Sequence, residues 1–191
     1  MSNLTPMMQQ YQNIKQNYSD SILFFRMGDF YEMFEKDAET AAKVLDIALT
    51  SRNKGGGEET PMAGVPAKSA ESYIAKLIDN DFKVAICEQL EDPGETSGLV
   101  KRDVIRVITP GTIIENEILD EKENNYLAAI ITNEDKIGFS YVDISTGEFF
   151  VTEFSSEAKI WDEIDRIHPS EIIINSNFKD NDNYKQLLRQ Y

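Results

Sequence analysis

Residues 21–34 read SILFFRMGDFYEMF, two short apolar runs separated by Gly28 and Asp29. The first run, Ser21–Met27, is typical of a buried β-strand. Gly28 and Asp29 predict a turn or bend. Apolar and polar residues alternate again from Phe30 to Phe34, so we expect a second strand directly after the turn.

If Phe30–Phe34 is a strand, Phe30 and Glu32 share one face of it. A Phe ring in that position can slide between base steps and kink a DNA duplex, and unstacking costs least where a base is mispaired. Nearby phosphates would raise the pKa of Glu32, and a protonated Glu can donate a hydrogen bond to a base edge. The alternative is a core strand with Phe30 and Phe34 buried and Glu32 merely exposed, and the pattern alone favours this alternative.

Helix and strand patterns continue on both sides of this stretch. Apolar residues at helical spacing predict helices, and short apolar or alternating runs predict strands. The expected helices span residues 5–18, 35–49 and 69–79, and the expected strands span 83–90 and 100–109. Residues 53–59 are rich in glycine and predict a flexible loop.

A second folded part is expected after an acidic stretch around residues 116–125. Its pattern is three strands, a helix and a strand. The expected strands span 126–132, 136–144, 148–154 and 171–174, and the expected helix spans 158–166. We therefore predict an α/β chain of mixed α+β character with a domain at 1–115, a linker at 116–125 and part of a second domain at 126–191. Cys87, Trp161 and Leu187 are expected in the core.

The composition limits the functions that this chain can have. Its 191 residues include one Cys, so no intrachain disulfide can form, and a reducing cytoplasm fits best. No apolar run is long enough to span a bilayer, and the N-terminus lacks the layout of a secretory signal. The net charge is −15. Residues 1–115 carry 12 Lys and Arg against 18 Asp and Glu, so we expect only weak affinity for DNA phosphates from this chain alone.

A second candidate site is the loop Ser51–Gly57, together with the segment Thr60–Pro66 that follows it. Arg52, Lys54 and Lys68, with glycine N–H groups nearby, could hold a sugar-phosphate backbone. The alternative is a surface loop with solvated charges. Nothing in the sequence matches a phosphate-binding P-loop, so we expect no nucleotide hydrolysis and no enzyme activity from this chain.

A third candidate is the acidic pair Asp143 and Glu148 in the second part. An acidic residue on the first strands of an α/β domain is how a two-metal nuclease site can begin. Two carboxylates are too few for such a site. A hairpin with solvated acids is therefore the favoured interpretation.

Five segments together resemble the N-terminal part of the bacterial MutS family of DNA mismatch repair proteins. They occur in the family's order and spacing, and residues 139–149 resemble the start of the family's connector domain. The five segments are 25–34, 49–52, 61–66, 84–89 and 106–112. The resemblance implies a mixed-sheet mismatch-recognition domain with flanking helices, followed by part of an RNase H-like connector domain that is not a nuclease.

The resemblance also implies roles for particular residues. Phe30 would stack on the mispaired or unpaired base, and Glu32 would hydrogen-bond it. The residues expected at the DNA backbone or groove are Arg26, Met27, Asp29, Arg52, Lys54, Met62, Gly64, Pro66 and Lys68. After Val65-Pro66 the family usually has Tyr-His, whereas this chain has Ala67-Lys68, which puts the local contacts of this loop in doubt.

The implied partner is mismatched double-stranded DNA, with no metal and no cofactor in this chain. ATP and Mg²⁺ would belong to a longer parent protein, which the resemblance implies is a homodimer that works with a MutL-type partner. We expect a cytoplasmic protein, associated with the nucleoid when bound to DNA, and no membrane contact. Two alternatives remain from the residues: a metal-dependent nuclease, and an acidic protein-interaction fragment.

Overall fold

The computed structural model describes residues 4–52, 59–92, 94, 98–114, 124–133, 136–179, 185 and 187. The chain divides into two compact units, Met1–Thr109 and Pro110–Tyr191. Of the predicted linker, only Asn124 and Asn125 are among the described residues. No helix in the described ranges is both long enough and apolar enough to cross a membrane.

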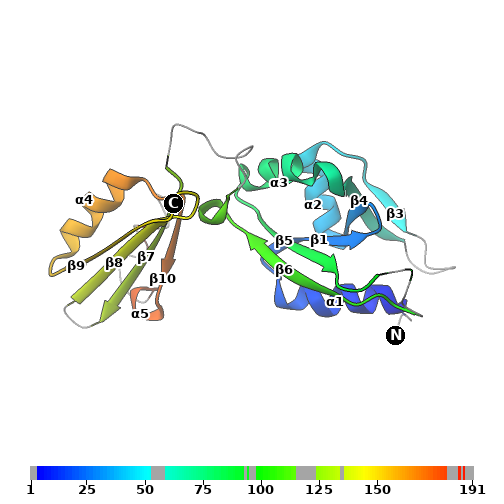
Figure 1. Cartoon of the computed structure of the whole chain (residues 1–191), viewed down its shortest axis with the longest axis horizontal. Coiled ribbons are helices and arrows are strands. Elements are labelled where there is room, and N and C mark those ends of the chain that lie inside the picture. Colours follow the sequence, from blue (N-terminus) through cyan, green and yellow to red (C-terminus); the bar gives the residue numbers. More distant parts are fainter. Residues whose placement is uncertain are drawn as a thin grey trace. The chain divides into compact units, whose positions relative to one another are not determined.

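The described part of the first unit contains a six-stranded mixed sheet (Figure 1). Its strands are β1 (Ser21–Met27), β2 (Phe30–Phe34), β3 (Thr50–Arg52), β4 (Thr60–Pro66), β5 (Lys83–Gln89) and β6 (Arg102–Ile108). Their order across the sheet is β3-β4-β2-β1-β5-β6. The pair β1 and β5 is parallel and the other neighbours are antiparallel. β2 is therefore a central strand, held on both sides.

Helices cover both faces of this sheet. They are α1 (Pro6–Asn17), α2 (Glu35–Leu45), α3 (Ala70–Ile78) and the short 3-10 helix η1 (Ala67–Ser69). α1 lies on one face, and α2 and α3 lie on the other (Figure 1). Under α1, Tyr11 packs edge-to-face against Phe25 and Phe34, with ring centres 5.5 and 5.0 Å apart. These contacts anchor the far end of β2 and leave its first residues beyond the aromatic cluster.

The strands predicted at 21–27 and 30–34 are confirmed with the same bounds. The loop that the resemblance implies at 61–66 is a strand in the structure, because Thr60–Pro66 forms the central strand β4. Pro61 and Pro66 weaken the sequence signal for this strand, because proline lacks the N–H that a strand interior uses. The helix predicted to reach residue 49 ends at Leu45, because Asp46 adopts a left-handed φ of 54°.

The described part of the second unit contains a four-stranded sheet of order β10-β7-β8-β9. The elements are η2 (Pro110–Thr112), β7 (Tyr126–Asn133), β8 (Lys136–Asp143), β9 (Glu148–Phe154), α4 (Glu157–Ile167), β10 (Glu171–Ile174) and α5 (Ser176–Lys179). β7, β8 and β9 are antiparallel neighbours, and β10 is parallel to β7. The predicted pattern of three strands, a helix and a strand is confirmed, and the fold is mixed α+β.

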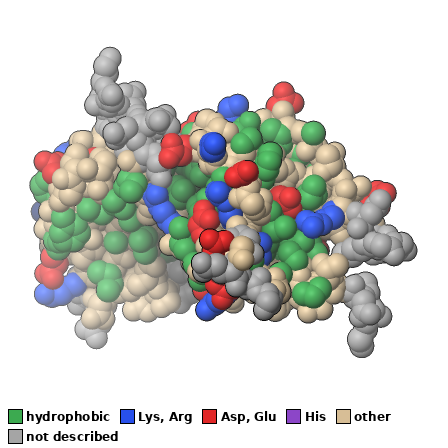
Figure 2. Space-filling view, turned by 45° about the vertical axis from the view of Figure 1, so that its right-hand side comes forward, with side chains coloured by type: hydrophobic (Ala, Val, Ile, Leu, Met, Phe, Trp, Pro, Cys, Tyr) green, Lys and Arg blue, Asp and Glu red, His purple; other side chains and the backbone are tan. Residues whose placement is uncertain are grey.

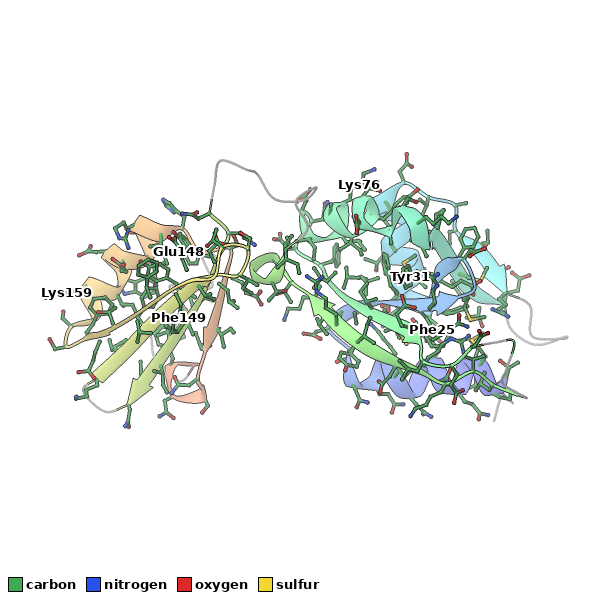
Figure 3. The ribbon with its side chains drawn as sticks, in the orientation of Figure 1. Phe25, Tyr31, Lys76, Glu148, Phe149 and Lys159 are labelled. Carbon is green, nitrogen blue, oxygen red and sulfur yellow. The ribbon has the colours of Figure 1, made fainter. Side chains whose placement is uncertain are left out.

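One face of the second sheet packs against α4 through Ile160, Ile164 and Ile167. The other face exposes apolar residues, among them Ile131, Phe149, Val151 and Ile173. Phe149 projects from β9 (Figure 3). The predicted core positions of Cys87 and Leu187 are confirmed, and Trp161 is partly buried against the α4 core.

Candidate nucleic-acid interface

Phe30 lies directly after the tight turn that joins β1 to β2. Met27 pairs with Phe30 across this turn, so Gly28 and Asp29 are its two central residues. Gly28 has a φ of +59°, a value that side chains with a β-carbon rarely adopt and that two-residue hairpins often require. The Phe30 side chain is 48% exposed, whereas Phe34 at the other end of β2 is fully buried. The core-strand alternative is therefore correct for Phe34 and wrong for Phe30.

Three hydrogen bonds fix the backbone just ahead of Phe30. The Ala67 N–H donates to the Asp29 carbonyl at 2.8 Å. Arg26 Nε donates to the Gly28 carbonyl at 2.6 Å, and Arg102 Nε donates to the Arg26 carbonyl at 2.8 Å. Donors from β1, from β6 and from the start of η1 thus restrict the turn. The exposed Phe30 ring therefore projects from a backbone that these hydrogen bonds hold in place.

Glu32 lies two residues beyond Phe30 on the same face of β2. Its Oε2 accepts a hydrogen bond from Arg52 Nη1 at 3.2 Å, and its side chain is 21% exposed. In β4 the residue opposite Glu32 is Gly64, where a β-carbon would lie 3.8 Å from the Glu32 Cγ. Because glycine has no side chain, no β4 side chain at this position covers the Glu32 carboxylate.

Partial burial raises the pKa of Glu32 above its usual range, and the positive charges of Arg52 and Arg102 oppose this shift without cancelling it. From the sequence, we expected DNA phosphates to raise this pKa. The fold alone already moves it in the same direction. A carboxyl group with a raised pKa takes up a proton more readily, so Glu32 can act as a hydrogen-bond acceptor when charged and as a donor when protonated.

Arg102 was not singled out from the sequence, yet it connects the Phe30 hairpin to its surroundings. It is buried, and its Nη1 donates to Gln10 Oε1 at 3.1 Å and to the Val100 carbonyl at 3.0 Å. Its guanidinium lies 5.0 Å from the centre of the Phe25 ring. In the sequence Arg102 lies between two other charged residues, Lys101 and Asp103, and the local pattern does not distinguish it from them. Its burial in β6 is what distinguishes it.

Arg26 and Tyr31 lie on the opposite face of the sheet from Phe30 and Glu32. The Tyr31 hydroxyl donates to Glu88 Oε1, and the Arg26 guanidinium lies 5.2 Å from the Tyr31 ring centre. Burial, reinforced by Glu88, raises the pKa of Tyr31 to about 12. Phe25, which pairs with Glu32, belongs to the α1 side of the sheet (Figure 3). The structure therefore places Arg26 on the opposite face of the sheet from Phe30 and Glu32.

The remaining predicted residues fall into three groups. The residues paired along the Phe30 face are Met27, Met62, Gly64 and Pro66. Asp29 in the turn and Lys68 in η1 are exposed. Lys54 lies outside the described residues. On the face of the molecule in Figure 2, basic and acidic side chains are interspersed rather than gathered into a basic patch.

Asp143 at the end of β8 differs from the prediction of a solvated acid. It is buried, with 2% exposure, and its carboxylate accepts hydrogen bonds from the Ser145 N–H and hydroxyl, the Thr146 N–H and the Asn125 N–H. Burial raises its pKa, but the hydrogen bonds outweigh burial, and the pKa lies below its usual value. In the described part of the chain, no three His, Cys, Asp or Glu side chains form a group that could hold a metal. The nuclease alternative is not supported.

Comparisons with known proteins connect these features to one family. A family model described as MutS domain I matches residues 5–117, and one described as MutS domain II matches residues 125–191. The chain is 65% identical over 192 aligned positions to the DNA mismatch repair protein MutS of Halothermothrix orenii, covering 100% of the chain and 21% of that relative. It is 53% identical over 181 positions to the DNA mismatch repair protein MutS of Staphylococcus aureus strain JH9, covering 95% of the chain and 21% of that relative. The chain thus spans about a fifth of the length of these relatives.

Proposed function

The chain belongs to the MutS family of DNA mismatch repair proteins, and from this premise we propose that its first unit reads mispaired or unpaired bases in duplex DNA. Phe30 is the wedge that stacks on the base, and Glu32 is the group that hydrogen-bonds it. The acidic protein-interaction alternative gains no support, because its motivation was charge alone.

The observation that carries this proposal is the exposed aromatic ring of Phe30 on a braced turn. Phe30 is 48% exposed at the start of a central strand and is not among the buried residues of the core. The hydrogen bonds from Ala67, Arg26 and Arg102 restrict the turn before any ligand is bound. A wedge that is already ordered loses less conformational entropy when it inserts, so more of the stacking energy appears as binding energy.

Glu32 adds a hydrogen bond beside the wedge. Phe30 and Glu32 share a face two residues apart, so the base that stacks on Phe30 presents its edge toward the carboxyl group. Unstacking a base costs a few kcal/mol and costs least where the base is mispaired. Phe30 and Glu32 therefore respond to how weakly a base is stacked and paired, and not to the surrounding sequence.

We propose Arg52, Lys68 and the backbone at Gly64 and Pro66 as neighbours of the sugar-phosphate backbone. The net charge of −15 limits the affinity that they provide, because phosphate binding depends on cations. Most of the affinity would come from the rest of a full-length protein. For that protein we propose a homodimer in the cytoplasm that uses ATP and Mg²⁺ and acts with a MutL-type partner. No segment of this chain matches a P-loop, so none of the steps proposed for its residues involves ATP.

The proposal is tested by Phe30→Ala in a full-length MutS protein that carries this chain, with binding to mismatched and matched duplexes compared by fluorescence anisotropy. We expect the variant to lose discrimination, because stacking on an aromatic side chain contributes about 1–3 kcal/mol per base. Phe149→Ala is a matched control, because Phe149 is also an exposed Phe on a strand but lies in the second unit. Equal affinity of the wild type for the two duplexes, or an equal loss in both variants, would contradict the proposal.

A further inference from the structure

The carboxylate of Glu32 faces two arginines that differ in how firmly they are held. Arg102 is buried and is fixed by hydrogen bonds to Arg26, Gln10 and Val100. Arg52 lies on β3, at the edge of the sheet, and its side chain is 42% exposed. Its Nη1 atom reaches Glu32 Oε2 at 3.2 Å. One cation is fixed within the fold, and the other lies partly in solvent.

The surroundings of Glu32 make these two arginines its charged neighbours. Across β1 the paired residue is Phe25, and across β4 it is Gly64, and neither carries a charge. Among the residues that the structure describes, the cations that act on Glu32 are Arg52 from β3 and Arg102 from β6. A change in the position of Arg52 therefore alters the electrostatic environment of Glu32, while Arg102 remains in place.

We propose that Arg52 is an exchangeable counter-ion that neutralises Glu32 in the free protein and transfers to a DNA phosphate when Glu32 engages a base. Glu32 then takes up one proton from solvent and donates it in a hydrogen bond to the base. This inference rests on the proposed function, and it assigns Arg52 a role in discrimination besides backbone attraction.

The exchange is feasible because the ion pair is partly exposed. Exposed pairs gain little from their mutual attraction, so a phosphate can replace Glu32 as the partner of Arg52 at small cost. When Arg52 leaves, one of the two influences that lower the pKa of Glu32 disappears, while burial still raises it. The phosphates add negative potential, which raises the same pKa further. Both effects favour the protonated form only when DNA is in place.

A double-mutant cycle in the full-length protein tests this coupling. The proteins are the wild type, Arg52→Gln, Glu32→Gln and the double variant, each measured by anisotropy on mismatched and matched duplexes over a salt series. In the Glu32→Gln background Arg52 has no competing partner, so we expect Arg52→Gln to weaken binding to mismatched DNA by about 3- to 10-fold and to reduce the salt slope by about 0.9. In the wild-type background we expect less than about a 2-fold loss, because Arg52 must first leave Glu32.

The pH dependence of discrimination provides a readout that a purely structural role would not change. In the wild type we expect discrimination to fall as the pH rises and Glu32 loses its proton. Arg52→Gln should move the midpoint of this fall to higher pH, because the pKa of Glu32 is higher without Arg52. Arg52→Lys should return it toward the wild-type value. Glu32→Gln should show no such transition, because its amide donates at every pH.

Lys83→Gln is the matched control for Arg52→Gln. Lys83 Nζ pairs with Asp20 Oδ2 at 3.2 Å, and its side chain is 43% exposed, so the variant removes a similar exposed ion pair from the same sheet. Lys83 is at the end of β5 that pairs with Ser21, away from the Gly28 turn. We expect it to leave the pH midpoint unchanged and to show no coupling to Glu32→Gln.

Three outcomes have distinct meanings. An equal or larger cost of Arg52→Gln in the wild-type background, with an unmoved pH midpoint, would overturn the exchange and leave Arg52 as an ordinary phosphate contact. A shifted midpoint with strong coupling would support it. If the wild type binds the two duplexes equally, the proposed function fails, and that result is separate from any effect of Arg52.

Discussion

Glu32 in the first unit and Asp143 in the second are carboxylates on strands, and both stood out in the sequence as candidate functional acids. Asp143 accepts hydrogen bonds from four donors, three of them in the turn that follows β8. Glu32 is partly exposed and accepts a hydrogen bond from Arg52, whose side chain is 42% exposed. The pKa of Asp143 lies below its usual value, and that of Glu32 lies above.

The difference shows how the surroundings of a carboxylate decide whether it is available to a ligand. The acceptor capacity of Asp143 is used by its own turn, so its negative charge is stabilised and fixed. Glu32 is desolvated without receiving enough donors in return, so its charge is costly and can be lost. A carboxylate such as Asp143 stabilises structure, and a carboxylate such as Glu32 can respond to a DNA base.

The comparison predicts that removing Asp143 has the largest effect on stability. Asp143→Ala leaves buried N–H groups of the turn without an acceptor, and we expect a loss of about 3 kcal/mol in the free energy of unfolding. Trp161 is the only Trp of the chain and packs against the core of the second unit, so its fluorescence in a urea titration measures this loss.

Glu148→Ala is the control for Asp143→Ala. Glu148 pairs with Asp143 across β8 and β9 but is exposed, so we expect a change within about 0.5 kcal/mol. Similar losses in the two variants would show that the turn does not depend on the Asp143 carboxylate, and the contrast with Glu32 would then disappear.

Arg102→Met should have the next largest effect. The carbonyls of Arg26 and Val100 lose a buried donor, and we expect a loss of about 2 kcal/mol. Cys87 is the only Cys of the chain and is buried in the first unit, so its rate of labelling by a thiol reagent under native conditions reports opening of that unit. Lys101→Met, at an exposed neighbouring position, should label at the wild-type rate. Equal rates for Arg102→Met and wild type would mean that Arg102 does not brace the hairpin.

Much of the fold could be predicted from the sequence because its signals are local. The apolar run at 21–27, the strand pattern at 148–154 and the helical stripes of α1 and α3 required no long-range information. β4 could not be predicted, because Pro61, Gly64 and Pro66 disfavour a strand locally, and its neighbours β3 and β2 decide its conformation. The early end of α2 depends on the left-handed residue Asp46, which the helical pattern does not reveal.

The candidate site was predictable to a similar extent. Strand alternation placed Phe30 and Glu32 on one face, and the exposure of Phe30 was the part that the pattern alone disfavoured. The hydrogen bonds that restrict the turn could not be predicted, because their donors Arg102 and Ala67 belong to elements distant in sequence. The burial of Asp143 depends on how its turn closes, so a local acidic motif could not reveal it.

Lowering the pH should weaken the second unit through Asp143. Because the pKa of Asp143 is lowered in the folded state, its stabilisation is fully present above the usual Asp pKa and is lost as the pH falls through the lowered value. The difference in unfolding free energy between the wild type and Asp143→Asn, followed by Trp161 fluorescence, should therefore narrow in acid. A constant difference down to acidic pH would mean that the hydrogen bonds do not depend on ionisation.

The smallest effect is expected for Glu32→Gln, and its sign is opposite. The pKa of Glu32 is raised in the folded state, so ionisation of Glu32 destabilises the fold as the pH rises from the usual Glu value through the raised value. Glu32→Gln avoids this cost but loses the exposed pair with Arg52, which contributes about 0.2–1 kcal/mol at most. We expect a net change within about 0.5 kcal/mol, measured by Cys87 labelling.

The pH dependence of this small difference in unfolding free energy distinguishes a structural role of Glu32 from a role in binding. Relative to the wild type, Glu32→Gln should become more stable as the pH rises and should lose that advantage in acid, where Glu32 is protonated in both the folded and the unfolded chain. If Glu32→Gln instead destabilises the first unit as Asp143→Asn does the second, Glu32 is a structural acid. A near-zero or favourable change means that the fold keeps a charge that it would be as stable without, and the reason for keeping it must then lie in what Glu32 binds.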